Sequence, residues 1–194
     1  MKKLNIKKMT TIAILMAMVI VLQFVGGMIP PIGGVVSISF VLIPIVVGAA
    51  LYGPTAGAIL GLTFGVVTVI NCANGTDPGG HMVFQASPIG CLLVVLSKGV
   101  LCGISAGSVY RLLSGKHEKI AMLCSAIVCP VVNTGVFLLC MILFFKDVLA
   151  QWASGSNIPA YILSVLLLCN FLPELLVNIV FSPAGQRLVR VVHK

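Results

Sequence analysis

Residues 38–72 read ISFVLIPIVVGAALYGPTAGAILGLTFGVVTVINC and contain no charged side chain. A helix that crosses a bilayer needs about 20 apolar residues, so this stretch is long enough for more than one helix. The run is interrupted at Tyr52-Gly53-Pro54, where a glycine followed by a proline favours a turn. The stretch therefore predicts two membrane helices joined by a tight turn, the first of them short.

The same apolar pattern extends over the rest of the chain. Of the 194 residues, 59% are hydrophobic and 8% are charged, whereas soluble proteins carry about 25% charged residues. The other apolar segments cover residues 9–27, 88–113, 120–145 and 158–182, and the last can continue past Pro183. We therefore expect an all-α integral membrane protein with six transmembrane helices, forming a single domain over residues 1–194.

The first apolar run follows several lysines, as in a secretory signal peptide. However, the run over residues 9–27 is too long for a signal sequence, and residues 26–31 make a poor cleavage site. We therefore predict a retained first helix.

The distribution of lysine and arginine predicts the orientation in the membrane, because cytoplasmic loops are enriched in both. With six helices and the N-terminus inside, the only loop lysine outside is Lys146. The basic residues on the cytoplasmic side are then Lys2, Lys3, Lys7, Lys8, Arg111, Lys116, Lys119, Arg187, Arg190 and Lys194. We therefore expect both termini to be cytoplasmic and residues 28–37, 73–87 and 146–157 to lie outside.

Several function classes find no support in the sequence. The net charge of +8 lies in short clusters between apolar runs, without the aromatic-interleaved basic stripes of a nucleic-acid-binding protein. The seven cysteines form no CxxC or Cys/His pattern, so we predict neither a metal site nor a cofactor. No nucleophile motif, HExxH motif or phosphate-binding loop occurs, so we expect no enzymatic activity.

Glycines recur every fourth residue in two of the predicted helices. One series is Gly53, Gly57, Gly61 and Gly65, and the other is Gly99, Gly103 and Gly107. Small residues at this spacing let helix backbones approach closely in lipid. Both series therefore predict helix packing.

Two ionisable residues, Lys98 and Glu174, fall inside predicted membrane helices. Such a group costs roughly 2.5–3.5 kcal/mol or more at the bilayer centre, so it needs a partner or a function. Lys98 lies thirteen residues before Arg111, and Glu174 lies thirteen residues before Arg187. At 1.5 Å per residue, both lie about 20 Å from the cytoplasmic surface, in the outer half of the membrane.

Uncharged polar side chains fall at similar or slightly greater height. They are Asn133, at a similar height, and Gln23 and Asn71, which are somewhat higher. Asn170 and Asn178 share a helix face with Glu174 through a spacing of four. This layer predicts a site for a small polar solute that opens to the outside. The alternative is structural, with a Lys98–Glu174 ion pair and amides that bond between helices.

With these features in view, the chain resembles the substrate-binding S components of energy-coupling factor (ECF) vitamin transporters. The most specific likeness is the run from Ile43 to Gly65, with its IP…GA.L.GP..GA..G..FG pattern. Other similar features are Ala13 and Ala17 on the first helix, the pair Asn133-Thr134, and Pro173-Glu174.

The pattern is most similar to the pantothenate-type members of that family. The resemblance implies that Lys98 neutralises the carboxylate of the vitamin, while Glu174 holds Lys98 or accepts from a ligand hydroxyl. The remaining predicted binding residues are Asn133, Thr134, Asn170, Gln85, Asn71 and Asn178. The pattern is shared by riboflavin-, folate- and queuosine-type members, but a shortage of aromatic residues near the expected site disfavours a flat ligand.

The resemblance also implies partners and a mechanism. The protein would lie in a prokaryotic plasma membrane, capture its vitamin from outside, and close residues 28–37 and 73–87 over it. It would then dock through Ala13 and Ala17 on a transmembrane T subunit that is coupled to two cytoplasmic ATPases. Three alternatives are a stand-alone permease, a membrane enzyme, and a structural subunit without a ligand.

Overall fold

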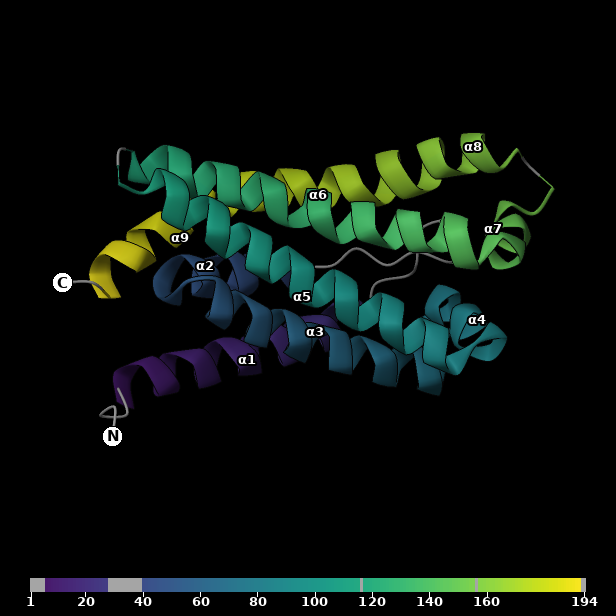
Figure 1. Ribbon diagram of the computed structural model, residues 1–194, viewed down its shortest axis with the longest axis horizontal. Coiled ribbons are helices and arrows are strands. Elements are labelled where there is room, and N and C mark those ends of the chain that lie inside the picture. The colour runs from purple at the N-terminus through teal and green to yellow at the C-terminus, as the bar shows by residue number, and fades with distance from the viewer. Residues whose placement is uncertain (1–5, 28–39, 116, 156, 193–194) are drawn as a thin grey trace.

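The chain folds into a bundle of α-helices, and both described ends of the chain lie at the same end of the bundle (Figure 1). The computed structural model describes residues 6–27, 40–115, 117–155 and 157–192. The elements are α1 (Ile6–Gly27), α2 (Leu42–Tyr52), α3 (Pro54–Asn74), α4 (Pro78–Ala86), α5 (Pro88–Leu113), α6 (Glu118–Phe144), α7 (Lys146–Ala153), α8 (Ile158–Tyr161), the π-helical segment η1 (Ile162–Phe171) and α9 (Leu172–Val192).

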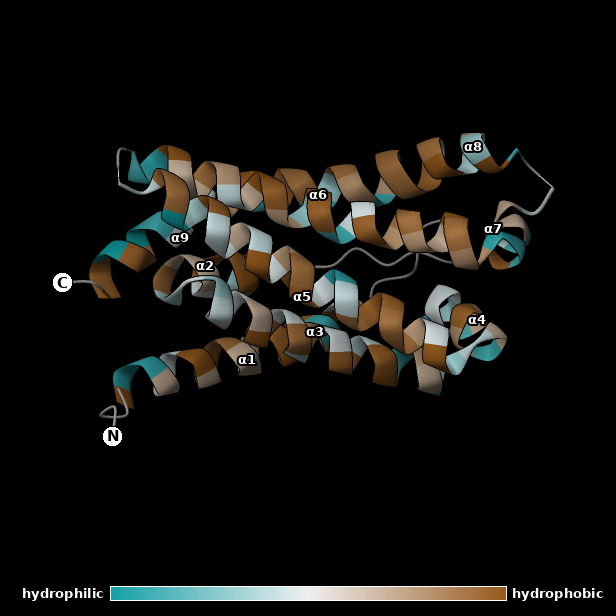
Figure 2. Cartoon of the chain, viewed as in Figure 1, coloured by the Kyte–Doolittle hydropathy of each residue, from teal (hydrophilic) through white to brown (hydrophobic). Residues whose placement is uncertain are grey.

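Five helical segments within the described residues are long and apolar enough to cross a membrane. They are α1, α3, α5, α6 and the continuous rod formed by α8, η1 and α9. Their hydrophobic positions cover most of the length of the bundle in Figure 2. Five of the six predicted membrane helices are thus present, and the last one continues through Pro183 to Val192, as the sequence allowed.

The predicted short helix is α2, which has eleven residues. At 1.5 Å per residue it is about 16 Å long, roughly half the ~30 Å thickness of the hydrocarbon core. It contacts α1, α3, α5, α6 and α9. From Leu42 to Leu51 every residue except Ile43 is buried. A helix that is apolar on all sides suits this position, because it has no face toward water.

The predicted turn between α2 and α3 is confirmed. Gly53 has a φ of 85°, a left-handed conformation that glycine adopts without steric cost. Pro54 follows as the first residue of α3. An N–H at this position has no partner within the helix, so a proline there removes no helical hydrogen bond.

The two glycine series pack against each other between α3 and α5. A Cβ atom on Gly57 would collide with the carbonyl oxygen of Gly103, and one on Gly61 would collide with that of Gly99. The same conflict holds in the reverse direction for Gly99 and Gly103. Both series therefore serve the close helix packing that their spacing predicts.

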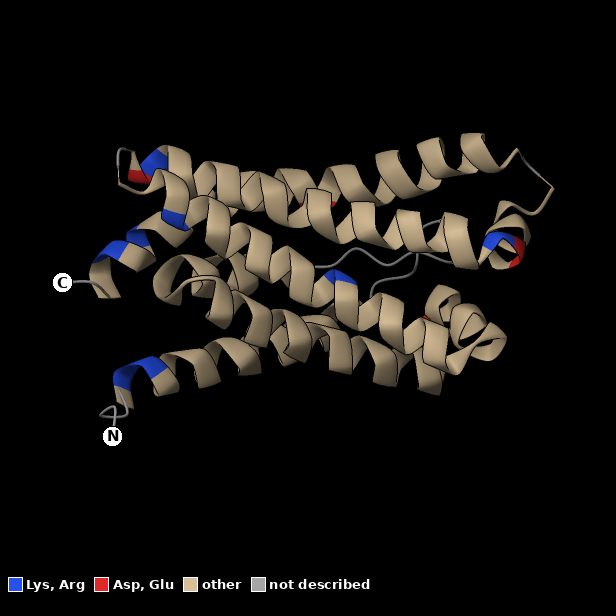
Figure 3. Cartoon of the chain, in the orientation of Figure 1, with Lys and Arg blue, Asp and Glu red and all other residues tan. Residues whose placement is uncertain are grey.

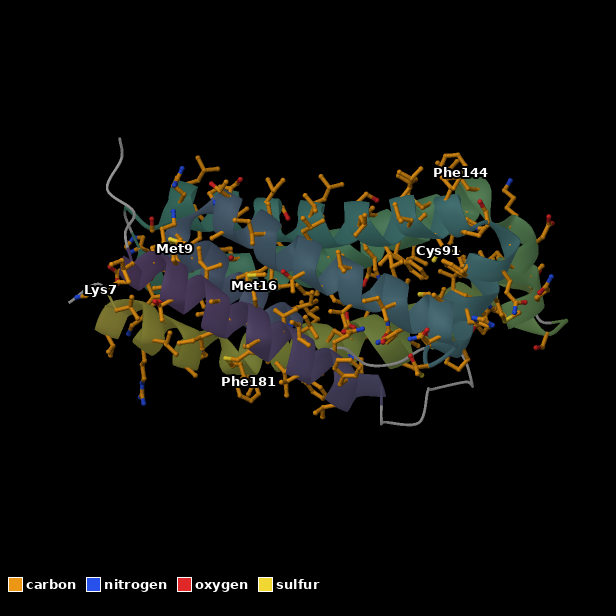
Figure 4. The ribbon with its side chains drawn as sticks, turned by 90° about the horizontal axis from the view of Figure 1, so that it is seen from below. Lys7, Met9, Met16, Cys91, Phe144 and Phe181 are labelled. Carbon is orange, nitrogen blue, oxygen red and sulfur yellow. The ribbon has the colours of Figure 1, made fainter. Side chains whose placement is uncertain are left out.

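Large apolar side chains on the outer surface suit contact with lipid. Phe144 is 74% exposed, and Phe181 is 49% exposed. In Figure 4 both point away from the bundle, whereas Cys91, which is fully buried, lies among the helices.

Two of the predicted outer segments contain short helices. Helix α4 occupies most of residues 73–87, and α7 occupies most of residues 146–157. The third predicted outer segment, residues 28–37, lies outside the described residues. The long helices therefore end in small helices at the end of the bundle opposite the described chain ends (Figure 1).

Basic residues gather at the end of the bundle where the described chain ends lie (Figure 3). At this end the Arg190 Nε donates to Glu118 Oε2 over 3.1 Å, which links α9 to α6. Both side chains are about half exposed, so this ion pair contributes little to stability.

We predict that Gly61→Ala destabilises the fold and Gly135→Ala does not. Alanine raises helix propensity by about 1 kcal/mol at either position. At Gly61 the added methyl group meets the backbone of α5, whereas nothing lies within 4 Å of a Cβ on Gly135. Overpacking of this kind costs roughly 1–3 kcal/mol.

The check is thermal unfolding of both variants in the same detergent. Equal unfolding temperatures for the two variants would contradict the α3–α5 contact.

Candidate functional site

A polar cavity of about 120 Å³ lies among the helices. One ordered water needs roughly 10–15 Å³ of such volume, so the cavity has room for about ten water-sized groups. Its walls come from α1, α3, α4, α5, α6, α7, η1 and α9. The polar and charged lining residues are Gln23, Thr68, Asn71, Thr76, Asp77, Lys98, Asn133, Thr134, Asn170 and Glu174.

Lys98 supplies the positive charge in this lining. Its Nζ lies 5.5 Å from the ring centroid of Phe64 on α3 and 5.0 Å from that of Phe137 on α6. A cation at this distance from an aromatic face is attracted by about 0.5–2 kcal/mol, depending on how far it is desolvated. The ammonium group is thus held in the cavity wall by two neutral rings, where it can attract an anion.

Several buried polar atoms near Lys98 have no hydrogen-bond partner among the described residues. They are the side-chain oxygens Asn133 Oδ1, Thr134 Oγ1 and Asn170 Oδ1, and the indole nitrogen Trp152 Nε1. Leaving one such group unpaired costs about 1–3 kcal/mol. All four residues line the cavity, so a polar ligand there can supply the missing partners.

Glu174 brings a carboxyl group into the same wall and is only 2% exposed. It lies in the first turn of α9, directly after Pro173 and the π-helical segment η1. A proline inside a helix lacks an N–H, and its ring clashes with the carbonyl four residues earlier. The wider turn of η1 relieves that crowding, and π-helical turns recur at functional sites. Asn170 and Glu174, on either side of Pro173, both line the cavity.

Helix α4 closes one side of the cavity and is held by local hydrogen bonds. Asp77 caps its N-terminus, since the Gly80 backbone N–H donates to Asp77 Oδ1 over 3.3 Å. His81 Nδ1 lies 2.8 Å from the carbonyl oxygen of Cys72 at the end of α3. The Thr76 hydroxyl donates to the carbonyl oxygen of Asn71 over 3.2 Å. The segment between α3 and α5 is thus a capped helix attached to α3.

Two thiols lie beneath α4. The Cys72 thiol on α3 donates to Asp77 Oδ2 over 3.9 Å, and the Cys91 thiol on α5 donates to the carbonyl oxygen of Gly80 over 4.0 Å. Both cysteines are buried and line the cavity. No group of three or more His, Cys, Asp or Glu side chains within the described part of the chain could hold a metal ion. The cavity therefore offers a cation, carboxyl groups, amides and hydroxyls as recognition groups.

Comparison with known proteins places the chain in a transporter family. Residues 7–184 match the family model described as "ECF transporter, substrate-specific component". The chain belongs to this family. Its members are transport subunits that work with a T subunit and ATPases on a small-molecule substrate, and they are not enzymes. No curated protein and no solved structure gave a match.

Six of the eight residues predicted for the site of this S component surround the cavity. They are Asn71, Lys98, Asn133, Thr134, Asn170 and Glu174. Gln85 lies outside the lining, because it is exposed on α4 with its Nε2 2.8 Å from His81 Nε2. Asn178 is also outside the lining, and its Nδ2 donates to the backbone carbonyl of Glu174 over 2.9 Å.

The expectation of few aromatic residues near the site is wrong. Phe64, Phe137 and Trp152 all line the cavity. Phe137 and Trp152 stack with centroids 6.2 Å apart. A helical face could have revealed two of them, since Phe64 lies four residues before Thr68 and Phe137 lies four residues after Asn133. Trp152 follows a break in the helix, so no helical spacing connects it to the site.

Burial raises the pKa of the Asp77 carboxyl above its usual value, despite its hydrogen bond with Gly80. The folded state therefore holds this proton more firmly than the unfolded state does, and the contribution of Asp77 to stability falls as the pH rises above about 4. We predict that Asp77→Asn, which keeps a good N-cap residue, removes this pH dependence. The stability of the variant minus that of the unchanged protein should therefore be larger at pH 7 than at pH 4.

The measurement is thermal unfolding of both proteins at the two pH values. Asp77→Ala serves as the control for the cap and should cost about 1 kcal/mol. A stability difference between Asp77→Asn and the unchanged protein that is the same at both pH values would refute this prediction.

Proposed function

We propose that this S component captures a small carboxylate micronutrient, with pantothenate as the best candidate. The observation that carries the proposal is that Lys98 lines the same cavity as Asn133, Thr134 and Asn170. An ammonium group would pair with a carboxylate, and the amide and hydroxyl groups would bond to ligand hydroxyls and an amide. Asn71 and Glu174 would complete the polar contacts.

Cavity size also favours a small ligand. A volume with room for about ten water-sized groups suits a short flexible acid better than a large ring system. The unsatisfied polar atoms would also give specificity, because a ligand that lacks a matching group leaves them unpaired.

A second candidate is a flat aromatic micronutrient of the riboflavin, folate or queuosine type. Phe64, Phe137 and Trp152 support it, because aromatic rings in the lining can stack on a planar ligand. In that case Lys98 would bind a carboxylate or another polar group at the edge of the ring.

For the membrane arrangement, we propose six helices with both termini in the cytoplasm. Helix α2 would then be a short half-span buried inside the bundle. The collection of basic residues at the end with the described chain ends supports this orientation, since that end would face the cytoplasm (Figure 3). The cavity and α4 would lie toward the outside, and α4 would act as part of a lid. A prokaryotic plasma membrane is the proposed location.

Partner docking would use the exposed face of α1. Ala13 and Ala17 are exposed, whereas Leu15 and Val19 on the same helix are buried against the bundle. Small residues four apart allow a partner helix to approach closely. We propose this face as the contact for the T subunit, which two ATPases energise. The alternative of a stand-alone permease would instead show uptake into vesicles that contain no partner subunits.

The first test of the ligand proposal is calorimetric titration of pantothenate into the purified protein and its variants. Lys98→Ala should weaken binding by about tenfold or more, because a hydrogen bond to a charged group contributes roughly 1.5–3 kcal/mol. Asn133→Ala should weaken it by about two- to tenfold, because a hydrogen bond between neutral groups contributes roughly 0.5–1.5 kcal/mol. Lys146→Ala removes an exposed lysine from α7 and should leave the affinity unchanged. Folded Lys98→Ala protein with unchanged affinity would rule out this role for Lys98.

The second test concerns docking. Ala17→Leu should reduce copurification with the T subunit and leave ligand affinity intact, because the added side chain keeps the partner helix away. Ala184→Leu is the matched control, since Ala184 is an exposed alanine on α9. If both variants copurify equally well, α1 is not the docking face.

A further inference from the structure

A second cleft, remote from the polar cavity, lies at the basic end of the bundle. It measures about 400 Å³ and is formed by the beginning of α1, the turn between α2 and α3, and the end of α5. Its polar lining residues are Lys8, Tyr52, Tyr110, Arg111 and Ser114. It shares no lining residue with the polar cavity.

The chemistry of this cleft favours an anion. Lys8 and Arg111 both line it, and no acidic side chain among the described residues does so. The acidic residue described at this end of the bundle, Glu118, is engaged by Arg190 at 3.1 Å. Two basic side chains in the lining of one cleft produce a local positive potential.

The parts of the cleft suit a phosphate group in particular. The Arg111 guanidinium packs against Gly53, where any side chain would collide with it. A guanidinium presents paired N–H donors that match two phosphate oxygens. Helix α3 begins at Pro54 beside this point, and the positive end of a helix dipole favours an anion. The hydroxyl groups of Tyr52 and Tyr110 can donate further hydrogen bonds.

The surroundings of the cleft suit a lipid. Met9, next to Lys8, is 56% exposed, and Leu112, next to Arg111, is 81% exposed. Lys8 Nζ lies 5.6 Å from the ring centroid of Tyr52, and tyrosine is enriched at membrane–water interfaces. In Figure 4, Lys7 and Met9 lie near the end of the bundle that carries the described chain ends. Acyl chains could therefore follow exposed apolar side chains while the headgroup enters the cleft.

We propose that this cleft binds the phosphate group of an anionic lipid headgroup from the adjacent leaflet. Basic pockets between membrane helices are suited to acidic lipid headgroups. Binding there would join α1, the α2–α3 turn and α5.

The experiment is native mass spectrometry of the full chain in detergent with added phosphatidylglycerol or phosphatidylcholine. The unchanged protein should retain phosphatidylglycerol preferentially. Lys8→Gln and Arg111→Gln should each weaken retention by about tenfold, whereas Arg111→Lys, which keeps the charge but loses the paired donors, should weaken it less than Arg111→Gln. The matched controls are Lys7→Gln, one residue from Lys8 but outside the lining, and Arg187→Gln, an exposed arginine on α9.

Inorganic phosphate is the second probe, followed by thermal shift. If phosphatidylglycerol raises the unfolding temperature and inorganic phosphate does not, the cleft binds a lipid. If inorganic phosphate raises the unfolding temperature as much as phosphatidylglycerol does, the cleft binds a soluble phosphate compound. The proposal is overturned if phosphatidylcholine binds equally well, or if the control variants lose as much binding as Lys8→Gln and Arg111→Gln. The proposal is also overturned if Lys8→Gln and Arg111→Gln no longer copurify with the T subunit but bind lipid as the unchanged protein does. The cleft would then be a protein contact.

Discussion

The close contact between α3 and α5 determines where the main site can form. Gly57 and Gly61 face Gly103 and Gly99 so closely that no side chain fits between the two backbones. Phe64 lies three residues after Gly61, and Lys98 lies one residue before Gly99. Fixing the two helices at this distance therefore brings the ammonium group of Lys98 over the ring of Phe64. Backbone contact, rather than hydrophobic attraction, holds the two sides of the cavity together in lipid.

This arrangement makes it possible to keep a lysine at membrane depth. An unpartnered cation there is costly, and two aromatic faces offset only part of that cost. An anionic ligand would offset more of it, and unsatisfied oxygens on α6 and η1 would gain hydrogen bonds at the same time. Affinity and specificity would then have the same physical origin, because the ligand would supply hydrogen-bond partners to buried polar atoms that have none among the described residues.

Much of the fold follows from the sequence, because apolar length and glycine spacing act locally. The long helices, the turn at Gly53 and the α3–α5 packing are all predicted from such patterns. Counting residues from the basic anchors also brings Lys98, Glu174 and Asn133 to one level, and all three line the cavity. Two predicted binding residues do not line the cavity, because local hydrogen bonds hold their side chains elsewhere. The capped helix α4 turns Gln85 toward His81, and Asn178 bonds back to its own helix.

Features that depend on distant segments could not be predicted in this way. Trp152 enters the cavity wall from α7, after the end of α6, and no periodic pattern relates it to Lys98. The π-helical segment before Pro173 changes the turn spacing, so Asn170 and Asn178 do not play equivalent roles although each lies four residues from Glu174. The burial of α2 inside the bundle likewise depends on all the helices that surround it.

The central claim is that Lys98 and its neighbours select a small carboxylate. The most direct measurement is a thermal-shift screen of the detergent-purified protein with pantothenate, riboflavin, folate, thiamine, biotin, cobalamin and queuine, together with the neutral alcohol analogue of pantothenate. A tight ligand raises the unfolding temperature by mass action. The account predicts that a carboxylate raises it and that the matching neutral analogue does not. A folded, monodisperse protein that responds to none of these compounds, or equally to the acid and its neutral analogue, would contradict the account.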